Sequence, residues 1–162
     1  MMRKFPSIIA ALFIVCCVSN AQTLPTKITS FLNRSYKNWK QAPGECQNRK
    51  WFLKGDFDGN GYQDYLVRVK TGKTSKARLN LIAFFGNEDK TYPAKRILDN
   101  SYTDEMRRSS FSVVKKGSKI QIGEGEGPTV TLKNDAASQF ICETDAIKTF
   151  VYESGKWRNI FG

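Results

Sequence analysis

The side chains best suited to chemistry in this 162-residue chain lie in one short, glycine-rich run. From position 55 to position 64 the run reads Gly-Asp-Phe-Asp-Gly-Asn-Gly-Tyr-Gln-Asp. Hard cations such as Ca²⁺ are held by about six to eight oxygens, which alternate residues of a tight loop can supply together. The expected metal ligands are the side chains of Asp56, Asp58, Asn60 and Asp64 and the backbone carbonyl of Tyr62, with Ca²⁺ as the ion.

Two further features favour a metal site over an ordinary turn. Gly59 and Gly61 permit the positive φ angles that such a reversal of the chain needs. The whole chain has 26 Lys plus Arg and only 15 Asp plus Glu, and three crowded acids repel one another unless a cation neutralises them. The alternative stays open, because Asp, Asn and Gly are common turn residues and the run would then be a hairpin turn that binds nothing.

The sequence around the run excludes an EF-hand and indicates a different kind of calcium loop. Counted from Asp56, position 12 of an EF-hand would be a Glu, but Val67 stands there, and the flanks have β-strand composition instead of helical composition. Residues 55–64 resemble the strand-borne calcium loop of the FG-GAP and VCBS repeat families, and residues 79–92 resemble the second strand and G-N-x-D turn of the same repeat. The resemblance covers about residues 51–98 and implies a calcium-binding β module. Those families usually string several repeats into a β-propeller, whereas this chain has one copy.

The N-terminal segment predicts export. A charged start at Arg3 and Lys4, an apolar run at 8–18 and a small-residue cleavage site at its end give residues 1–21 the pattern of a secretory signal peptide. The apolar run is too short for a membrane-spanning helix, and no other stretch approaches the required length. We therefore expect a single exported domain at residues 22–162, secreted or periplasmic.

Cysteine count and net charge extend this expectation. Of the four cysteines, Cys46 and Cys142 lie outside the predicted signal, and such a pair most simply forms a disulfide in an oxidising compartment; the alternative is two buried free thiols. Removal of Arg3 and Lys4 with the signal leaves 24 basic and 15 acidic residues, a formal net charge of +9. This charge favours an anionic envelope component or a protein partner, whereas export argues against nucleic acid.

Hydrophobic periodicity predicts one helix followed by strands. Residues 24–42 predict a helix, whose apolar positions recur three and four apart at Ile28, Phe31, Leu32, Tyr36 and Trp39. The expected strands are residues 51–54, 65–70, 78–85, 95–98, 111–115, 119–123, 129–133, 147–152 and 157–161, with a short helical turn at 103–106. The expected fold class is α+β, an N-terminal helix packed on a largely antiparallel β-sheet with one calcium loop between two strands.

The residue types present argue against catalysis. The chain has no histidine, which excludes Ser-His-Asp and Cys-His nucleophilic sites and the usual general base. Two cysteines cannot complete a structural zinc site unaided, and the Gly-Lys-Thr string at 72–74 lacks the upstream glycine of a phosphate-binding loop. We therefore expect a binding or interaction protein with no catalytic residues. The alternative is a periplasmic inhibitor or immunity protein that blocks a cognate enzyme or toxin.

Overall fold

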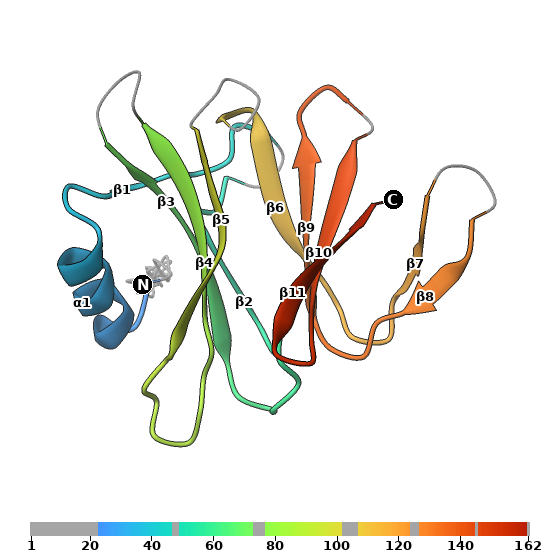
Figure 1. Cartoon of the computed structure of the whole chain (residues 1–162), viewed down its shortest axis with the longest axis horizontal. Helices are drawn as coiled ribbons and strands as arrows, with labels where there is room; N and C mark the ends of the chain where they lie inside the picture. Colours follow the sequence, from blue (N-terminus) through green and yellow to red (C-terminus); the bar gives the residue numbers. More distant parts are fainter. Residues whose placement is uncertain are drawn as a thin grey trace, which may run out of the picture.

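The computed structural model describes residues 23–46, 49–72, 77–101, 107–123, 127–144 and 146–161. Within these ranges, the chain forms helix α1 (Thr26–Ser35) and then a succession of strands (Figure 1). The strands are β1 (Lys40–Gln41), β2 (Phe52–Gly55), β3 (Asp64–Thr71), β4 (Arg78–Phe84), β5 (Ala94–Ser101), β6 (Ser109–Val114), β7 (Lys119–Gln121), β8 (Thr129–Thr131), β9 (Ala136–Ile141), β10 (Ile147–Glu153) and β11 (Lys156–Phe161). The predicted signal peptide and the predicted helical turn at 103–106 lie outside the described residues.

The strands form three antiparallel sheets. In the first, β3 pairs with β4 on one side and with both β1 and β2 on the other, and β4 pairs in turn with β5. The second sheet has the order β11-β10-β9-β6, and β7 and β8 form a separate two-stranded hairpin that extends away from it (Figure 1). The register of β2 with β3 places Gly55 opposite Asp64, so the candidate metal loop joins two directly paired strands.

Both faces of the first sheet are covered by apolar side chains, because successive residues of a strand point to opposite faces. On β3, Leu66 faces the second sheet, whereas Val67 and Val69 face α1. The core between the two sheets comprises Leu53, Phe57, Leu66, Leu81, Ala83, Phe85, Phe111, Ala137 and Phe150. On the other face, Ile28 and Leu32 of α1 are completely buried in a second apolar cluster.

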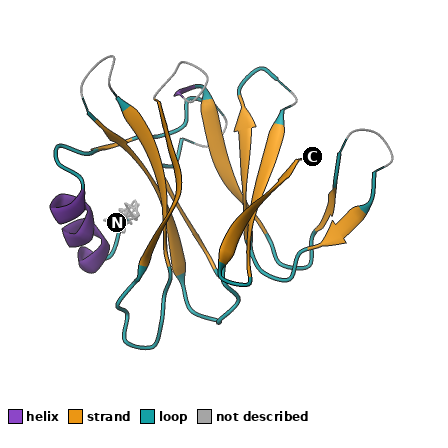
Figure 2. Ribbon diagram, in the orientation of Figure 1, coloured by secondary structure: helices purple, strands orange, loops and turns teal. Residues whose placement is uncertain are grey.

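The predicted α+β fold class is wrong, because the chain is mostly β (Figure 2). A single helix of ten residues does not form a helical layer in the described part of the chain. The face of the first sheet that carries Leu66 is covered by a second sheet, and the two together form a β-sandwich. The expected single sheet with a helix packed on it is therefore replaced by several antiparallel sheets.

The helix is also shorter than predicted, and it ends at Ser35 instead of residue 42. Tyr36 has an extended backbone, and Asn38 has a positive φ of 56°. The chain then turns so that Trp39 stacks on Trp51, with ring centroids 6.0 Å apart, and residues 40–41 pair with β3 as strand β1. Tertiary pairing therefore overrides the helical periodicity in this segment.

All nine predicted strands are confirmed, but β1 and β9 were not predicted. The predicted pairing of Cys46 with Cys142 is also confirmed, since the two residues form a disulfide with their Cα atoms 5.8 Å apart. This bond joins the segment before β2 to the residue that follows β9. Along the described residues, no helix combines the length and the apolar character that crossing a membrane requires.

Candidate metal site in the β2–β3 loop

The β2–β3 loop brings three carboxylates together. One carboxylate oxygen from each of Asp56, Asp58 and Asp64 lies within 4.8 Å of the others. Calcium–oxygen distances are about 2.3–2.6 Å, so two oxygens on one ion are at most about 5 Å apart. The spacing of these three carboxylates is therefore compatible with a shared metal ion, and no other such group of three occurs in the ranges that the structure covers.

Asp64 is the buried member of the group. Its side chain is 0 % exposed, and its two oxygens accept hydrogen bonds from the backbone N–H groups of Phe57 at 2.7 Å and Gly86 at 2.6 Å. The pKa of Asp64 is raised to about 6, because burial and the nearby charge of Asp58 together outweigh the hydrogen bonds from Gly86 and Phe57, which lower it. An ionised carboxylate in this position is costly unless a positive charge lies beside it.

Asp56 and Asp58 are only partly buried and are oriented by the backbone of their own loop. The two oxygens of Asp56 accept from the N–H groups of Gly59 at 2.9 Å and Gly61 at 3.1 Å, and Asp58 accepts from the N–H of Asn60 at 3.1 Å. Burial and the charge of Asp56 raise the pKa of Asp58. A carboxylate has about four lone-pair sites, so these hydrogen bonds leave lone pairs for a cation.

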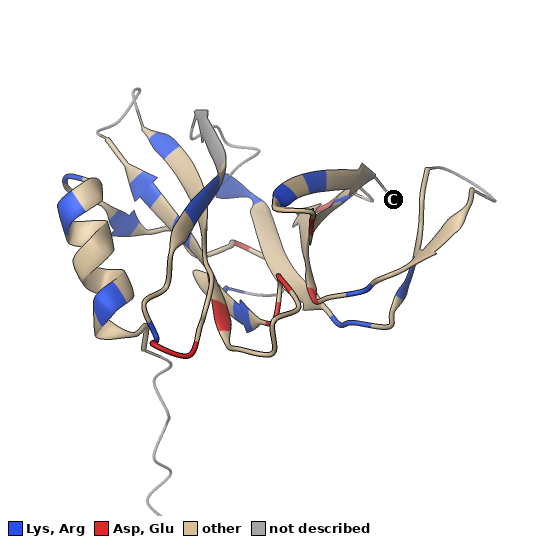
Figure 3. Ribbon diagram, turned by 60° about the horizontal axis from the view of Figure 1, so that its bottom comes forward, with Lys and Arg blue, Asp and Glu red and all other residues tan. Residues whose placement is uncertain are grey.

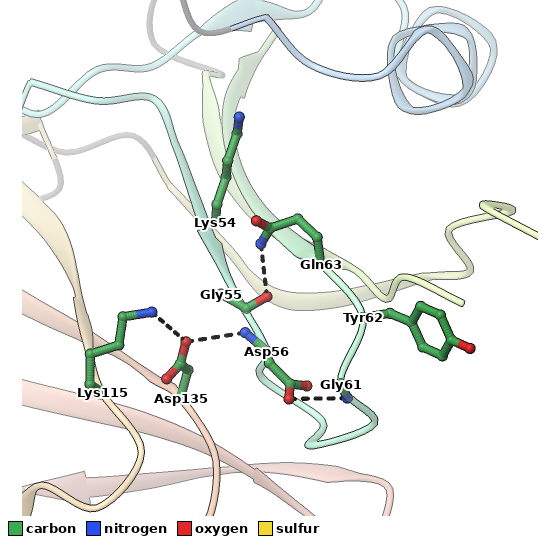
Figure 4. A pocket seen from close by; sticks show the side chains of 8 residues that line it. All are labelled: Lys54, Gly55, Asp56, Gly61, Tyr62, Gln63, Lys115 and Asp135. Atoms are coloured by element: carbon green, nitrogen blue, oxygen red, sulfur yellow. Dashed lines mark hydrogen bonds and ion pairs between the residues drawn. The ribbon is translucent and has the colours of Figure 1, made fainter. Parts of the chain in front are cut away.

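The other two predicted ligand residues, Asn60 and Tyr62, lie in the same loop, but the Asn60 amide turns its nitrogen and not its oxygen toward Asp58. The Asn60 side-chain nitrogen donates to Asp58 at 3.1 Å and to the Gly86 carbonyl at 2.8 Å, and its Oδ1 accepts from the Tyr62 N–H at 2.8 Å. Through its bond to Gly86, the Asn60 side chain links the loop to the segment that follows β4. The ligand predicted at Tyr62 is its backbone carbonyl and not its side chain, which is 44 % exposed and whose ring points away from Asp56 (Figure 4).

The glycines of the loop behave as the sequence predicted. Gly59 and Gly61 have φ angles of +79° and +84°, a region that costs a residue with a side chain about 1–2 kcal/mol. Gly59 also meets a neighbour, because a Cβ there would lie 2.3 Å from Oδ1 of Asn134. The close approach of Asn134 shows that the connection between β8 and β9 packs directly on the loop.

Two residues important to this geometry were not predicted as part of the site. Gly86 anchors Asp64, and a Cβ at Gly86 would lie 2.3 Å from the Gln63 carbonyl oxygen. Asp135 lies 79 residues from Asp56 and accepts from the Asp56 N–H at 3.2 Å (Figure 4). Gly86 falls within the G-N-x-D turn of the family resemblance, but no pattern near Asp135 signals its place beside the loop.

Asp135 is held by several donors. Lys115 Nζ lies 2.8 Å from its carboxylate and the Lys116 N–H donates at 3.0 Å. Burial on its own raises the pKa of Asp135, but the bonds from Lys115, Lys116 and Asp56 outweigh it and hold the pKa below its usual value. Asp135 is therefore ionised at neutral pH.

A recess of about 290 Å³ lies between this ion pair and the loop (Figure 4). Its lining residues are Lys54, Gly55, Asp56, Gly61, Tyr62, Gln63, Lys115 and Asp135. Several of its polar groups already bond to one another, since Lys115 pairs with Asp135 and Gln63 Nε2 donates to the Gly55 carbonyl at 3.1 Å. Part of the hydrogen-bonding capacity of this recess is therefore already used within the protein.

The surface charge is unevenly distributed around the loop. Asp and Glu gather mainly along the edge formed by the β2–β3, β4–β5 and β8–β9 connections, whereas Lys and Arg are spread over α1 and the strands (Figure 3). A cation and an anionic partner would therefore be attracted to different parts of the surface. Comparison of the chain with protein-family models, with curated proteins and with solved structures finds no match.

Proposed function

We propose that this chain is an exported calcium-binding β module that acts as a binding protein and not as a catalyst. The observation that carries the proposal is the convergence of Asp56, Asp58 and Asp64 within 4.8 Å in a loop between two paired strands. Three like charges at this distance, one of them completely buried, make the ion-free loop unfavourable. A divalent cation would remove that repulsion.

Calcium fits the donor set better than other common ions. The available donors are carboxylate, amide and carbonyl oxygens, which suit hard cations, whereas zinc and copper prefer nitrogen and sulfur. Mg²⁺ demands a nearly regular octahedron at about 2.0–2.1 Å, and Ca²⁺ accepts irregular shells of higher number. The side chains of Asp56, Asp58 and Asp64 would hold the ion, with oxygens of Asn60 and Tyr62 and water completing its shell.

The position of the loop between two paired strands supports the resemblance to the FG-GAP and VCBS repeat families. In this chain the loop joins β2 to β3, and the predicted second half of the repeat includes β4 and the Gly86 turn that bonds to Asp64. The surrounding fold departs from the propeller that those families usually form, because the repeat-like segment belongs to one sheet of a β-sandwich. We therefore propose a lone calcium loop of this type.

The predicted signal peptide and the Cys46–Cys142 disulfide support export to an oxidising compartment. A formal net charge of +11 for the whole chain, and of +9 without residues 1–21, supports an anionic envelope component as the partner. Exposed positive charge is provided by Lys27, Arg34, Lys37 and Lys40, on and next to α1, whereas the acidic residues lie along the edge that includes the β2–β3 loop (Figure 3). The binding surface proposed for the anionic partner is therefore separate from the metal loop.

Affinity capture from the native cell envelope tests this function. The mature protein, immobilised through its C-terminus, is expected to retain anionic envelope polymers in millimolar calcium, and less of them at high salt because charge interactions are screened. A charge-reversed variant, Lys27→Glu with Lys37→Glu, is expected to retain less. The matched control is Lys119→Glu with Arg158→Glu, which makes the same change of net charge at exposed positions of β7 and β11. Capture of one stoichiometric enzyme or toxin, with no polymer, would show instead that the chain is an inhibitor or immunity protein.

A further inference from the structure

A second recess of about 290 Å³ lies on the other side of the metal loop. Three connections meet there: the β2–β3 loop, the β8–β9 connection and the tight turn between β10 and β11. The side chains that define it are Asp58, Lys133, Asn134, Tyr152, Glu153 and Ser154. The volume is near the lower end of the range for small-molecule sites, about 300–1,000 Å³, which suits one or two rings of a small ligand.

Four polar side chains of this recess have no partner within the described part of the chain, whereas Asp58 already accepts hydrogen bonds from Asn60. Lys133, Asn134, Glu153 and Ser154 make no side-chain hydrogen bond or ion pair with other residues that the structure describes. Asn134 and Glu153 are nevertheless half-buried, so each has limited access to water. Half-buried polar groups without protein partners gain most from a ligand that supplies their missing hydrogen bonds.

The shape of the recess follows from the β10–β11 turn and from the packing of Asn134 on the metal loop. Ser154 and Gly155 both have positive φ angles, 49° and 76°, which is the geometry of the tight hairpin turn that joins β10 to β11. Asn134 is fixed by its close contact with Gly59, and the next residue, Asp135, bonds to the backbone of Asp56. The recess is therefore formed by two connections that pack on or beside the metal loop.

The mixture of donors and acceptors selects the class of ligand. Asp58 and Glu153 accept hydrogen bonds, Lys133 donates, and Asn134 and Ser154 do both. The lining side chains present two carboxylates and one ammonium group to an anion, and the neighbouring Lys95 ammonium already donates to the Gly155 carbonyl, so the recess does not favour an anion. Neutral hydroxyl groups both donate and accept, so several of them on one ring would satisfy all of these side chains. The half-buried Tyr152 ring packs on Phe85 and Trp157 and forms one wall of the recess, so ligand recognition there depends on the polar side chains.

We propose that this recess binds a polyhydroxylated ligand, one or two sugar rings of a carbohydrate. The inference deepens the proposed function, because Asp58 belongs both to the recess and to the metal loop. If calcium orders Asp58, sugar and calcium bind cooperatively, and each raises the affinity of the other by the same factor.

The test is an amide-resolved NMR titration of the mature protein with the methyl glycosides of glucose, galactose, mannose and N-acetylglucosamine, in millimolar calcium and in chelator. At least one glycoside is expected to shift the amides of Asn134, Ser154 and Gly155 in a saturable way. Glu153→Gln and Asn134→Ala are each expected to weaken that binding about tenfold, the scale of one lost hydrogen bond to a polar or charged group. Glu88→Gln, in the acidic β4–β5 connection outside the recess, is the matched control and is expected to change nothing.

The inference is overturned if no glycoside gives saturable shifts at these amides, if both variants bind as the wild type does, or if inorganic phosphate binds there more tightly than every sugar. If Asn134→Ala does not fold, Glu153→Gln decides the question alone. Melting curves in calcium and chelator, recorded in parallel, separate the two proposals. Stabilisation by calcium without sugar binding overturns only the recess, whereas sugar binding without any calcium effect supports the recess and overturns the metal site.

Discussion

The backbone N–H of Asp56 donates to the Asp135 carboxylate at 3.2 Å, and the N–H of Asp135 donates to the Asp56 carbonyl at 3.0 Å. This reciprocal pair joins the metal loop, which belongs to the first sheet, to the residue that precedes β9 in the second sheet. Phe57, the next residue of the loop, is completely buried in the core between the two sheets and lies 6.2 Å from the Trp157 ring. The loop therefore connects the two sheets of the sandwich.

The first prediction concerns this connection. Asp135→Ala is expected to lower the free energy of unfolding by about 2–3 kcal/mol, because it removes the acceptor of charge-assisted bonds at a site that is 8 % exposed. Lys115→Ala is the matched control, and since the Lys115 side chain is 70 % exposed it is expected to lose less than about 1 kcal/mol. Urea unfolding of both variants in chelator measures the difference. Equal losses would show that the surface ion pair, and not the backbone bonds of Asp135, stabilises this connection.

The second prediction separates calcium binding from folding at Asp58. At a free calcium concentration ten times the dissociation constant, the wild-type protein is expected to gain about 1.4 kcal/mol of stability. Asp58→Ala is expected to abolish that gain and to leave the melting temperature in chelator unchanged or slightly raised, because repulsion from Asp56 is relieved. Glu88→Ala, an exposed acid in another connection, is expected to keep the full gain. A wild-type melting temperature that is identical in calcium and in chelator would show that the loop is only a turn.

The third prediction concerns Asp64, whose role differs from that of Asp58. Asp64→Ala leaves the buried N–H groups of Phe57 and Gly86 without an acceptor. It is therefore expected to lower the unfolding free energy even in chelator, by about 2–4 kcal/mol, as well as to abolish stabilisation by calcium. Melting curves of Asp64→Ala and Asp58→Ala, recorded side by side in chelator, give the comparison. If the two variants melt alike, Asp64 contributes charge alone and does not organise the loop.

The candidate site is easier to predict from the sequence than the fold is, because its residues are close together in the sequence. Asp56, Asp58 and Asp64 lie within nine residues, and Gly59 and Gly61 supply the turn, so spacing alone indicates that their oxygens converge. Asp135 is a long-range partner, since its place depends on how the second sheet docks on the first. No local pattern encodes that docking.

The same distinction explains the errors in the fold. Apolar runs and turn signals predict nine of the strands. The pairing of strands depends on contacts between residues far apart in the sequence, so local patterns do not distinguish a β-sandwich from a single sheet. Strand β9 escaped prediction because Ala136–Ile141 begins with small and polar residues, which suit a central strand between β6 and β10 but lack a strong apolar alternation. The predicted helix extends past Ser35 because Tyr36 and Trp39 keep the helical spacing of apolar residues. In the structure both side chains pack against the apolar cluster beside α1 from an irregular segment that follows the helix.

The fourth prediction concerns the close approach of Gly86 to the loop. A Cβ at this position would lie 2.3 Å from the Gln63 carbonyl oxygen, so Gly86→Ala is expected to lower the unfolding free energy by about 1–3 kcal/mol. The backbone must move to accommodate the added Cβ, and this displaces the Gly86 N–H that donates to Asp64. The calcium affinity is therefore expected to fall. Gly117→Ala, at a φ of +84° with no neighbour within 4 Å, is expected to lose about 1–2 kcal/mol of stability and to keep the wild-type calcium affinity. If Gly86→Ala keeps the wild-type calcium affinity, the β4–β5 connection does not contribute to the metal site.

The last prediction concerns the disulfide between Cys46 and Cys142, which closes a loop over 96 positions of sequence. In the chain-entropy model, a loop of about this length contributes about 4–5 kcal/mol, because the bond restricts the unfolded chain. Cys46→Ala with Cys142→Ala is therefore expected to lower the unfolding free energy by up to that amount. Calcium is still expected to stabilise the double variant by about 1.4 kcal/mol at a free concentration of ten times the dissociation constant. The reason is that the β2–β3 metal loop contains neither cysteine. Urea unfolding of the double variant with and without calcium measures both quantities. A double variant that stays folded but loses its response to calcium would show that the metal loop depends on the disulfide.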